Sequence, residues 1–586
     1  MSEVCVELVG KLVGEMLGLS KEELSPSDNL ISLGLGSLDI MRIAGLLTKN
    51  GCNVTFSELV SNPCMASWVN FARERSARSS SNGSPLLGSA NYSKGDPFPI
   101  TSVQHAYMVG RRDGQELGGT ACHAYMEFEC GSLDAAKLER AVELLILRHP
   151  MLRARFSDDG TARIEDKVTW KGLTTYRVEG AGNPDSRIEG IRQELSHLRF
   201  DIEQDDLIDV RLTVVSPKRT IMHINVDLLA ADVLSIQVLL EDLAHLYDGT
   251  DLAPIEIDFM EYARRTGIGE DARNEDREYW LNRIDNMPGG PSLPLKAPME
   301  SVKRSQFTRM EYLIDSKSWK NFTEKGRQIG VTQSMGIAAV YAKALSRWSE
   351  DKKFLLNLPL FNRKPIHPDV DKIVSDFTSL ILLEADCANA ISLLELASQM
   401  QGRFQQDVAH SSFGAVEVLR ELSHRCPNDP KKAPVVFASN IGTQFISNKV
   451  EDVFGPLSKM LAETPQVLLD HQIYDHKNGL LLAWDYVSEL LDDKIAKQMF
   501  EAYCTAVRFY CENDWSEPFP DLLPPSQRAA RAEANSEGAD LGGGTLHGRF
   551  FARAQAEPDA PALRWGADGE ATYGELAGRA LRIAGG

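Results

Sequence analysis

One serine stands at a position in the sequence where a phosphate group could be attached. Ser37 follows the glycine-rich turn at residues 34–36 and begins a segment whose apolar residues recur at helical spacing. A serine at a helix start can serve as an N-cap, because its hydroxyl accepts a hydrogen bond from a free backbone amide. The same position favours phosphate, since the helix dipole and the free N–H groups are electropositive there. The residue types alone leave both roles open.

Two aspartates five residues apart form a second candidate site. Asp227 ends an apolar strand pattern, and Asp232 precedes a helix pattern that begins near Val233. Carboxylates can exchange protons with a substrate. The alternative is structural: Asp232 would cap the helix and Asp227 would lie at the surface. This spacing alone is weak evidence for acid-base chemistry.

A third aspartate, Asp470, ends the apolar run at residues 467–469. Burial raises the pKa of a carboxyl group, so an aspartate at the end of a buried strand can exchange protons near neutral pH. The alternative is a strand-end aspartate that meets solvent. Asp470 is therefore a candidate acid-base group.

Hydrophobic periodicity predicts the elements that must position these residues. Apolar residues at helical spacing, in residues 3–18, from Ser37 onward and in residues 66–77, predict a helical bundle of about 75 residues. From residue 96 to about 520, strand patterns alternate with helix patterns, which indicates an α/β domain with two lobes. Typical strands are predicted at residues 221–226, 434–437 and 480–484, and a helix at residues 235–246.

The overall composition narrows the class of protein. The net charge of -20 argues against nucleic acid or an anionic membrane surface as a partner, and no apolar run approaches the ~20 residues that span a bilayer. The nine cysteines form no CxxC pair, so neither a zinc site nor a thioredoxin motif is indicated, and no metal site is expected. An odd cysteine count without an export leader predicts a protein of the reducing cytoplasm.

Residues 30–41, Leu-Ile-Ser-Leu-Gly-Leu-Gly-Ser-Leu-Asp-Ile-Met, resemble the attachment segment of aryl and peptidyl carrier proteins. The resemblance implies that Ser37 carries 4'-phosphopantetheine, transferred from coenzyme A by a phosphopantetheinyl transferase. No adenylation domain precedes this segment, as in siderophore synthetases of the yersiniabactin and pyochelin type. By that similarity, a stand-alone aryl-acid adenylating enzyme is the expected partner that loads the carrier.

Five further segments resemble, in order, the motifs of heterocyclization domains of nonribosomal peptide synthetases. They lie at residues 98–111, 148–153, 376–379, 434–437 and 464–470. Several long motifs in order are strong evidence, unlike any one of them alone. The resemblance implies a condensation-superfamily fold, a chloramphenicol-acetyltransferase-like pair of α/β lobes with a tunnel for two pantetheine arms.

The resemblance also implies roles for the aspartates near residue 230. Condensation domains carry His-His-x-x-x-Asp at this position, and here Asp227 and Leu228 replace the two histidines while Asp232 keeps the last place. In the family the last aspartate pairs with an arginine of the other lobe, so Arg363 is the expected partner of Asp232. We therefore expect a mainly structural role for Asp232 among the catalytic candidates, and both roles stay open for Asp227.

Asp470 occupies the place of the family's cyclodehydration aspartate. Its usual companion is a threonine, which in this sequence is replaced by Ala438. Alanine cannot orient a carboxylate or a water molecule by hydrogen bonding. The neighbouring Ser439 has a hydroxyl but should face the opposite side of its strand.

These resemblances imply a domain layout. It comprises an aryl or peptidyl carrier as a four-helix bundle (1–76), a linker (77–95), a heterocyclization domain (96–520, lobes 96–290 and 291–520), a second linker (521–544) and the truncated start of an adenylation domain (545–586). The last part rests on residues 546–551, 558–563 and 572–576. Downstream adenylation and carrier domains are the further expected partners.

The expected reaction joins a carrier-bound acyl group, which by the resemblance is an aryl group, to a carrier-bound cysteine, serine or threonine. Loss of water then gives a thiazoline or oxazoline, as in siderophore biosynthesis. One alternative is a condensation-only acyltransferase, because Ala438 lacks the hydroxyl. Another is a scaffold that only gathers carrier domains, against which Asp470 and the full motif set argue.

Overall fold

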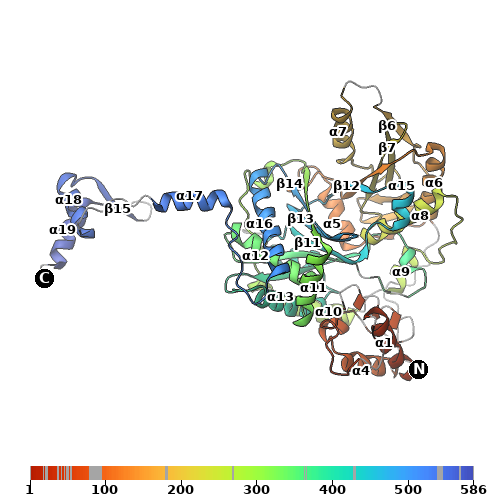
Figure 1. Ribbon diagram of the computed structural model, residues 1–586, viewed down its shortest axis with the longest axis horizontal. Coiled ribbons are helices and arrows are strands. Elements are labelled where there is room, and N and C mark those ends of the chain that lie inside the picture. The colour runs from red at the N-terminus through yellow and green to blue at the C-terminus, as the bar shows by residue number, and fades with distance from the viewer. Residues whose placement is uncertain are drawn as a thin grey trace. The chain divides into compact units, whose positions relative to one another are not determined.

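The computed structural model divides the chain into two compact units, Met1–Leu522 and Leu523–Gly586. It describes residues 2–17, 19, 24–35, 39–40, 43–44, 46–47, 52, 54, 56–77, 95–178, 183–266, 270–361, 363–364, 366–426, 431–536, 545–565 and 569–584. Ser37, the predicted attachment site, lies outside these residues. Figure 1 shows the arrangement of elements within each unit.

The first part of the chain is helical, as its periodicity predicts. Helices α1 (Ser2–Leu17), α3 (Phe56–Ser61) and α4 (Met65–Ala77) surround buried apolar residues such as Val13 and Trp68, and the indole Nε1 of Trp68 donates to the carbonyl of Leu59 at 3.0 Å. The described residues between 39 and 47 are also helical. The predicted helices at residues 3–18 and 66–77 are confirmed.

The N-terminal lobe of the α/β domain is built on a five-stranded sheet with the order β12-β2-β7-β6-β5. The core lies between this sheet and helices α6 and α8, where strands and helices present buried apolar side chains to each other. The elements are β2 (His123–Cys130), β5 (Thr174–Arg177), β6 (Ile208–Ser216), β7 (Arg219–Asp227), β12 (Leu457–Glu463), α5 (Ser102–Gly110), α6 (Ala135–Arg148), α7 (Pro184–Leu195) and α8 (Val233–Tyr247). A small sheet, β1 (Phe98–Pro99), β4 (Thr161–Ile164) and β3 (Ala154–Ser157), completes it.

The C-terminal lobe is built on a six-stranded sheet with the order β10-β9-β11-β13-β14-β8. The elements are β8 (Phe307–Asp315), β9 (Lys353–Phe361), β10 (Thr378–Asp386), β11 (Val435–Gln444), β13 (Leu469–His476), β14 (Gly479–Val487), α11 (Ser316–Gln328), α12 (Gln333–Trp348), α13 (Leu393–Val408), α14 (Ala415–Arg425) and α16 (Asp493–Glu512). Helices α11, α12, α13 and α16 pack on one another and on this sheet, as Figure 1 shows. The predicted strands at residues 221–226 and 480–484 and the predicted helix at residues 235–246 fall within observed elements, whereas the strand predicted at residues 434–437 begins one residue later, at Val435.

Strand β12 departs from a simple division of the chain into two lobes. It belongs by sequence to the C-terminal half but pairs antiparallel with β2 of the N-terminal lobe, for example Met460 with Met126. The chain thus crosses between the lobes before it enters β13, and this crossing ties the strand that begins at Leu469 to both sheets.

The second unit contains α17 (Pro525–Ser536), α18 (Leu546–Ala556), the antiparallel pair β15 (Pro561–Trp565) and β16 (Gly569–Thr572), and α19 (Tyr573–Ala584). Part of the segment predicted as the second linker is therefore helical, because alanine, arginine and glutamate after Pro525 favour a helix.

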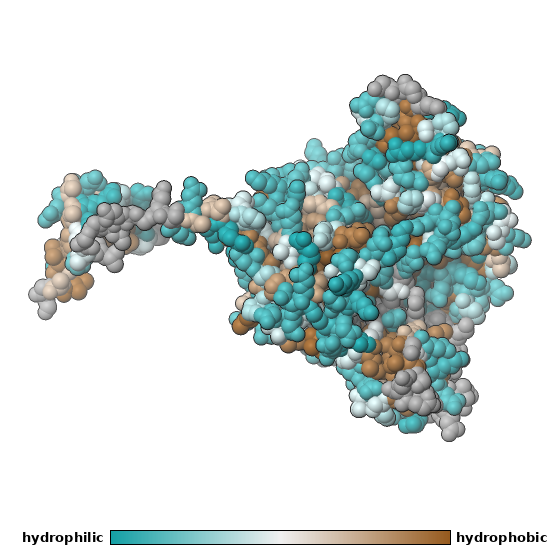
Figure 2. Space-filling view, in the orientation of Figure 1, coloured by the Kyte–Doolittle hydropathy of each residue, from teal (hydrophilic) through white to brown (hydrophobic). Residues whose placement is uncertain are grey.

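Figure 2 shows that the visible face of the α/β domain is mostly hydrophilic. Among the described residues no helix has the length and apolar character that a membrane span requires.

Candidate active site

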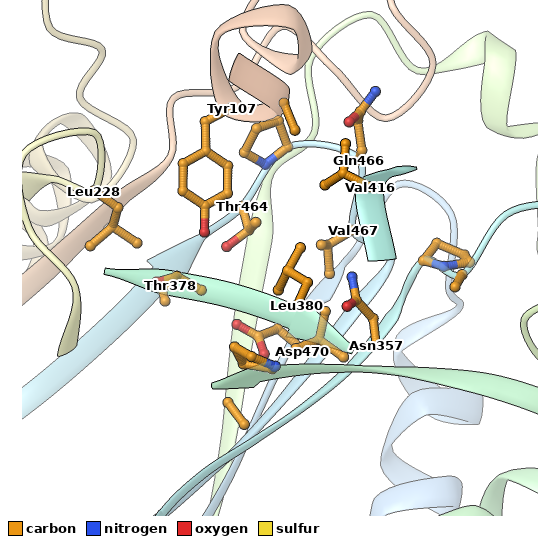
Figure 3. Close-up of a pocket in the computed structure, with 18 of the residues that line it drawn as sticks. Tyr107, Leu228, Asn357, Thr378, Leu380, Val416, Thr464, Gln466, Val467 and Asp470 are labelled. Atoms are coloured by element: carbon orange, nitrogen blue, oxygen red, sulfur yellow. The ribbon is translucent and has the colours of Figure 1, made fainter. Parts of the chain in front are cut away.

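A cavity of about 530 Å³ lies between the two lobes of the α/β domain. Both lobes contribute to its lining, which combines apolar side chains with a few polar groups (Figure 3). The lining residues used below are Tyr107, Leu228, Asp232, Asn357, Asp376, Thr378, Ala438, Asp470 and Gln472. Three of the seven predicted site residues, Asp232, Ala438 and Asp470, are among them.

Asp470 faces this cavity because of strand register. Asn357 on β9 pairs with Val436 on β11, Val436 pairs with Asp470 on β13, and Asp470 pairs with Asp485 on β14. Side chains at paired positions of neighbouring strands point to the same face of a sheet. Asn357 and Asp470 therefore enter the cavity from one row of the sheet, and Figure 3 shows both of them there.

The carboxyl group of Asp470 is buried and half satisfied. The amide Nε2 of Gln472 donates to its Oδ2 at 2.6 Å. Its Oδ1 is also buried and has no hydrogen-bond partner in the part of the chain that the structure describes. Burial, aided by the negative charge of Asp485, raises the pKa of Asp470 to about 7 against the opposing effects of Gln472 and Arg309.

A network of side chains holds Gln472 in place. Its Oε1 accepts from Nη2 of Arg309 at 3.1 Å and from the hydroxyl of Tyr474. Arg309 is fixed in turn by Asp485, whose Oδ1 lies 2.7 Å from its Nε. Because all donor and acceptor groups of this amide are oriented, Nε2 of Gln472 must point at Asp470.

Gln472 lies opposite Ala438, the position where the family motif has a threonine. The two residues are register partners on β13 and β11. A hydrogen-bond donor to Asp470 is therefore present on this face of the sheet although Ala438 has none. Gln472 was not among the predicted site residues, although its place two residues after Asp470 puts it on the same face of the strand.

Ser439 points away from the cavity, as strand alternation predicts. Its Oγ lies 2.7 Å from Oγ of Ser334 on α12, on the other side of the sheet. Ser439 therefore contacts the helical layer and cannot reach Asp470.

The predicted ion pair between Asp232 and Arg363 is present. Nη2 of Arg363 donates to Oδ1 of Asp232 at 2.8 Å, and both side chains are buried. The same oxygen accepts from the backbone N–H of Ser235 at 2.7 Å, so Asp232 also caps α8. The guanidinium of Arg363 lies over the ring of Phe377, 4.3 Å from its centroid, and donates to the carbonyl of Ile373 at 2.9 Å. The pair braces the floor of the cavity.

Asp227 is buried, against the simple expectation of a surface carboxylate, but it lies outside the lining of the cavity. Its Oδ2 accepts from Nη1 of Arg111 at 2.6 Å and its Oδ1 from the backbone N–H of Leu229 at 3.1 Å. Arg111 also donates to the carbonyl of Phe200 at 2.8 Å. With both oxygens engaged, the geometry favours a structural role for Asp227 over the catalytic one. Arg111 was not among the residues predicted to contact Asp227.

The described residues around Ser37 fit an attachment site at a helix start. The preceding turn is fixed by buried Leu30, Ile31 and Leu35 and by Gly34, whose φ of 119° a side chain would disfavour. Ile40, three residues after Ser37, is helical and buried. A phosphopantetheine arm at this position would supply the thiol to which the acyl group is bound as a thioester. No group of His, Cys, Asp or Glu able to hold a metal ion occurs among the described residues.

Comparison with known proteins assigns the chain to a family. Residues 98–513 match the family described as Condensation domain. The chain belongs to this family. Residues 7–72 match the family described as Phosphopantetheine attachment site, so a carrier domain precedes the condensation domain. The phosphopantetheine cofactor and its transferase follow from that match.

The chain is similar to two larger curated synthetases. It is 35% identical over 98% of its length to phenyloxazoline synthase MbtB of Mycolicibacterium paratuberculosis, covering 49% of that protein. It is 36% identical over 99% of its length to pyochelin synthetase PchE of Pseudomonas aeruginosa, covering 40% of that protein. It thus spans less than half the length of these curated relatives.

The fold is similar to that of a solved cyclization domain. The structure of the EpoB cyclization-docking bidomain from Sorangium cellulosum matches with a TM-score of 0.66 and 30% identity, over 72% of this chain and 87% of that one. The predicted architecture, a helical carrier region followed by a two-lobed condensation-superfamily domain, is confirmed.

Loss of the Gln472 donor should slow any reaction that uses ionised Asp470. A Gln472→Leu variant should lower that rate at pH 7 by about 10-fold or more, because a hydrogen bond to a charged group contributes about 1.5–3 kcal/mol. The rate of ring closure against pH is the measurement, and its midpoint should shift upward. Adding Ala438→Thr should recover part of the rate, whereas Ser439→Ala, on the opposite face, should have no effect. An unmoved midpoint would contradict the role of Gln472.

The raised pKa of Asp470 should also appear in the stability of the protein. The folded chain keeps the Asp470 proton up to about pH 7, whereas the unfolded chain releases it near pH 4, so this carboxyl destabilises the fold progressively as the pH rises between these values. The stability of Asp470→Asn relative to the parent should therefore grow by up to about 4 kcal/mol over that range. Urea unfolding at a series of pH values measures it, with the exposed Asp371→Asn as a control. A pH-independent difference would refute the raised pKa.

Proposed function

We propose that this chain condenses an acyl group held on Ser37 with the amine of a carrier-bound cysteine, serine or threonine, and then closes the amide to a thiazoline or oxazoline. The observation that carries the proposal is the buried carboxyl of Asp470, which faces a cavity between two lobes and has one oxygen without a partner among the described residues. Similarity to a phenyloxazoline synthase and to a pyochelin synthetase supports the proposal, since a phenyloxazoline contains both an aryl group and an oxazoline ring.

Ring closure requires a group that moves protons. The thiol or hydroxyl of the acceptor residue attacks the carbon of the new amide, and a carbon–sulfur or carbon–oxygen bond forms. The amide oxygen then departs as water with the proton of the nucleophile and the proton of the amide nitrogen, which leaves a carbon–nitrogen double bond. Asp470 accepts the first proton and returns it to the departing oxygen.

The environment of Asp470 suits both halves of this task. A pKa of about 7 makes the ionised and the protonated form accessible near neutral pH. Asn357 adds a second polar group to the row, since its buried Oδ1 has no partner among the described residues and is free to accept the N–H of the substrate amide. Apolar side chains beside these groups, such as Leu228, Leu380 and Val467, lower the local exposure of the substrate to water.

We also propose a wider setting for this reaction. An aryl group supplied by a stand-alone aryl-acid adenylating enzyme, an acceptor supplied by downstream adenylation and carrier domains, and a place in siderophore biosynthesis in the cytoplasm complete the proposal. We also propose the domain limits of 1–76, 96–520 and 545–586, with linkers between them. The matched ranges 7–72 and 98–513 support the first two limits.

A condensation-only acyltransferase is the second candidate, because Ala438 provides no hydroxyl to Asp470. The donor supplied by Gln472 argues against it. A silent scaffold would not need a buried, unpartnered carboxylate oxygen, which is expensive to keep.

The test is a reconstituted single turnover. A broad-specificity transferase loads the chain from salicyl-coenzyme A, and cysteinyl or seryl pantetheine serves as the acceptor. Mass spectrometry separates the amide from a product lighter by one water, and the Ser37→Ala chain, which should not be loaded, is the control. Full loading of that variant would place the attachment elsewhere, and an amide as the only product would favour the second candidate.

A further inference from the structure

A second buried carboxyl group, Asp376, lines the same cavity as Asp470. Its Oδ1 accepts from the backbone N–H of Thr378 at 3.0 Å. Its Oδ2 is buried and makes no hydrogen bond to any residue that the structure describes. Ring closure as proposed above uses Asp470 and assigns no role to Oδ2 of Asp376. A buried carboxylate with a free oxygen is costly to maintain, so it calls for a function.

Hydrogen bonds fix Asp376 beside the start of α8. The carbonyl of Ser375 accepts from the backbone N–H of Asp232 at 3.1 Å and from Oγ of Ser235 at 2.7 Å. On the other side, the N–H of Phe377 donates to Oδ2 of Asp232 at 3.4 Å. Asp376 is thus held on both sides against the junction of β7 and α8, which is the position of the acid-base histidine in condensation domains.

No other carboxylate described at this junction has a free oxygen, and the one further unpartnered oxygen, the hydroxyl of Ser375, is far too weak a base for this role. Leu228 stands at the second histidine position of the motif and has no ionisable group. Asp227 is engaged by Arg111 and by the N–H of Leu229, and Asp232 by Arg363 and two backbone N–H groups. The unpartnered Oδ2 of Asp376 is the remaining candidate.

Asp376 and Asp470 occupy different places in the cavity. Asp376 lies two residues before β10 at the edge of the six-stranded sheet, and β9 and β11 separate β10 from the Asp470 strand β13. The hydroxyl of Tyr107 lies within electrostatic range of both carboxyl groups. Burial raises the pKa of this hydroxyl, and the charges of Cys122, Asp376 and Asp470 raise it further. The two carboxyls therefore lie in reach of one substrate without forming a coupled pair.

We propose that Asp376 is the proton acceptor for amide formation and that Asp470 serves only the later ring closure. This assignment rests on the proposed function. The amine nitrogen of the acceptor attacks the thioester carbon of the donor, and a carbon–nitrogen bond forms while the carbon–sulfur bond breaks. Oδ2 of Asp376 takes the proton that the nitrogen loses and passes it to the departing sulfur, which leaves as a thiol. No oxidant, metal or further reactant is required.

The electrostatics of Asp376 agree with this role. Burial, with the negative charge of Asp232, raises its pKa to about 7 against the hydrogen bonds from Thr378. An α-amine has a pKa near 8, so the donor and the acceptor of the proton are closely matched, which is the condition for efficient general base catalysis.

Two substrates separate the two steps experimentally. The full chain loaded at Ser37 from salicyl-coenzyme A, with cysteinyl pantetheine as acceptor, reports amide formation. Preformed salicyl-cysteinyl pantetheine reports ring closure alone. For Asp376→Asn, amide formation should fall by about 10²–10⁴-fold while ring closure stays near the parent rate. Asp376→Glu, which keeps a carboxylate, should retain part of the amide formation, and the exposed Asp371→Asn should change neither rate.

The ratio of the two rates is the decisive quantity, because it does not depend on the fraction of folded protein. If the rate of amide formation divided by the rate of ring closure is lower in Asp376→Asn than in the parent, the assignment is supported even if this variant is less stable. An unchanged ratio overturns it, whether both rates are normal or both fall together. If the parent makes the amide but never the ring, the proposed function fails, and the rate of amide formation per folded molecule still tests Asp376.

Discussion

Replacing Asp470 with asparagine should leave amide formation largely intact and slow the loss of water by about 10²–10⁴-fold, the usual contribution of a general acid-base group. Asparagine keeps the shape of the side chain and can still face Gln472, but it cannot take a proton from the nucleophile. The product of the variant should therefore be the open-chain amide, detected by mass spectrometry under conditions in which the parent forms the ring.

The pH dependence of the parent provides an independent check of the same residue. Ring closure needs ionised Asp470, so its rate should rise with pH to a plateau above about 7, the pKa that burial gives this group. Asp232→Asn is not a suitable control here because it alters the cavity floor, whereas Ser439→Ala changes the opposite face of β11. Normal ring closure by Asp470→Asn would refute the assignment and turn attention to Asp376 as the acid-base group for both steps.

Breaking the buried ion pair should have the largest effect on stability. Asp232→Asn should lower the free energy of unfolding by roughly 3–5 kcal/mol, because it leaves the guanidinium of Arg363 buried without a counter-charge. Urea unfolding of the α/β domain, followed by tryptophan fluorescence, measures the loss. A double-mutant cycle provides a further check. Arg363→Met should lower the free energy of unfolding much less in the Asp232→Asn background than in the parent, because only the parent has a carboxylate at residue 232 that this change leaves without a counter-charge.

An exposed ion pair of equal length is the matched control. Nη2 of Arg112 lies 2.8 Å from Oδ1 of Asp158, and both side chains are exposed. Asp158→Asn should therefore change the stability by no more than about 1 kcal/mol. If Asp232→Asn were as mild as Asp158→Asn, the pair would not brace the two lobes.

The parts of the site that follow from local pattern could be predicted from sequence. The ending of an apolar run marks Asp470, strand alternation places Ser439 on the far face, and the residue before a helix pattern is a cap, as Asp232 is. The Asp232–Arg363 pair could be predicted only through the family resemblance, because its partners are 131 residues apart.

The other features of the site depend on strand register and on where the chain crosses between the lobes, and the hydrophobic periodicity of the sequence encodes neither. Asn357, Val436 and Asp470 form one row although two long segments separate them, and no local pattern aligns these strands. Asp227 is flanked by apolar residues in the sequence, which do not reveal its partner. That partner, Arg111, lies at the C-terminal end of α5, 116 residues earlier. The transfer of β12 to the N-terminal sheet is likewise a tertiary feature, since its own sequence is compatible with either sheet.

The fate of the donor carbonyl oxygen tests the central claim most directly. The chain is loaded with salicyl thioester that carries heavy oxygen in its carbonyl group, and cysteinyl and seryl pantetheine are supplied in turn. If Asp470 promotes attack of the acceptor side chain on the amide carbon, the product is lighter by one water and has lost the label, and Asp470→Asn yields only the labelled amide. A product that keeps the label, either as an unclosed amide from the parent chain or within an oxazoline ring, would contradict the account.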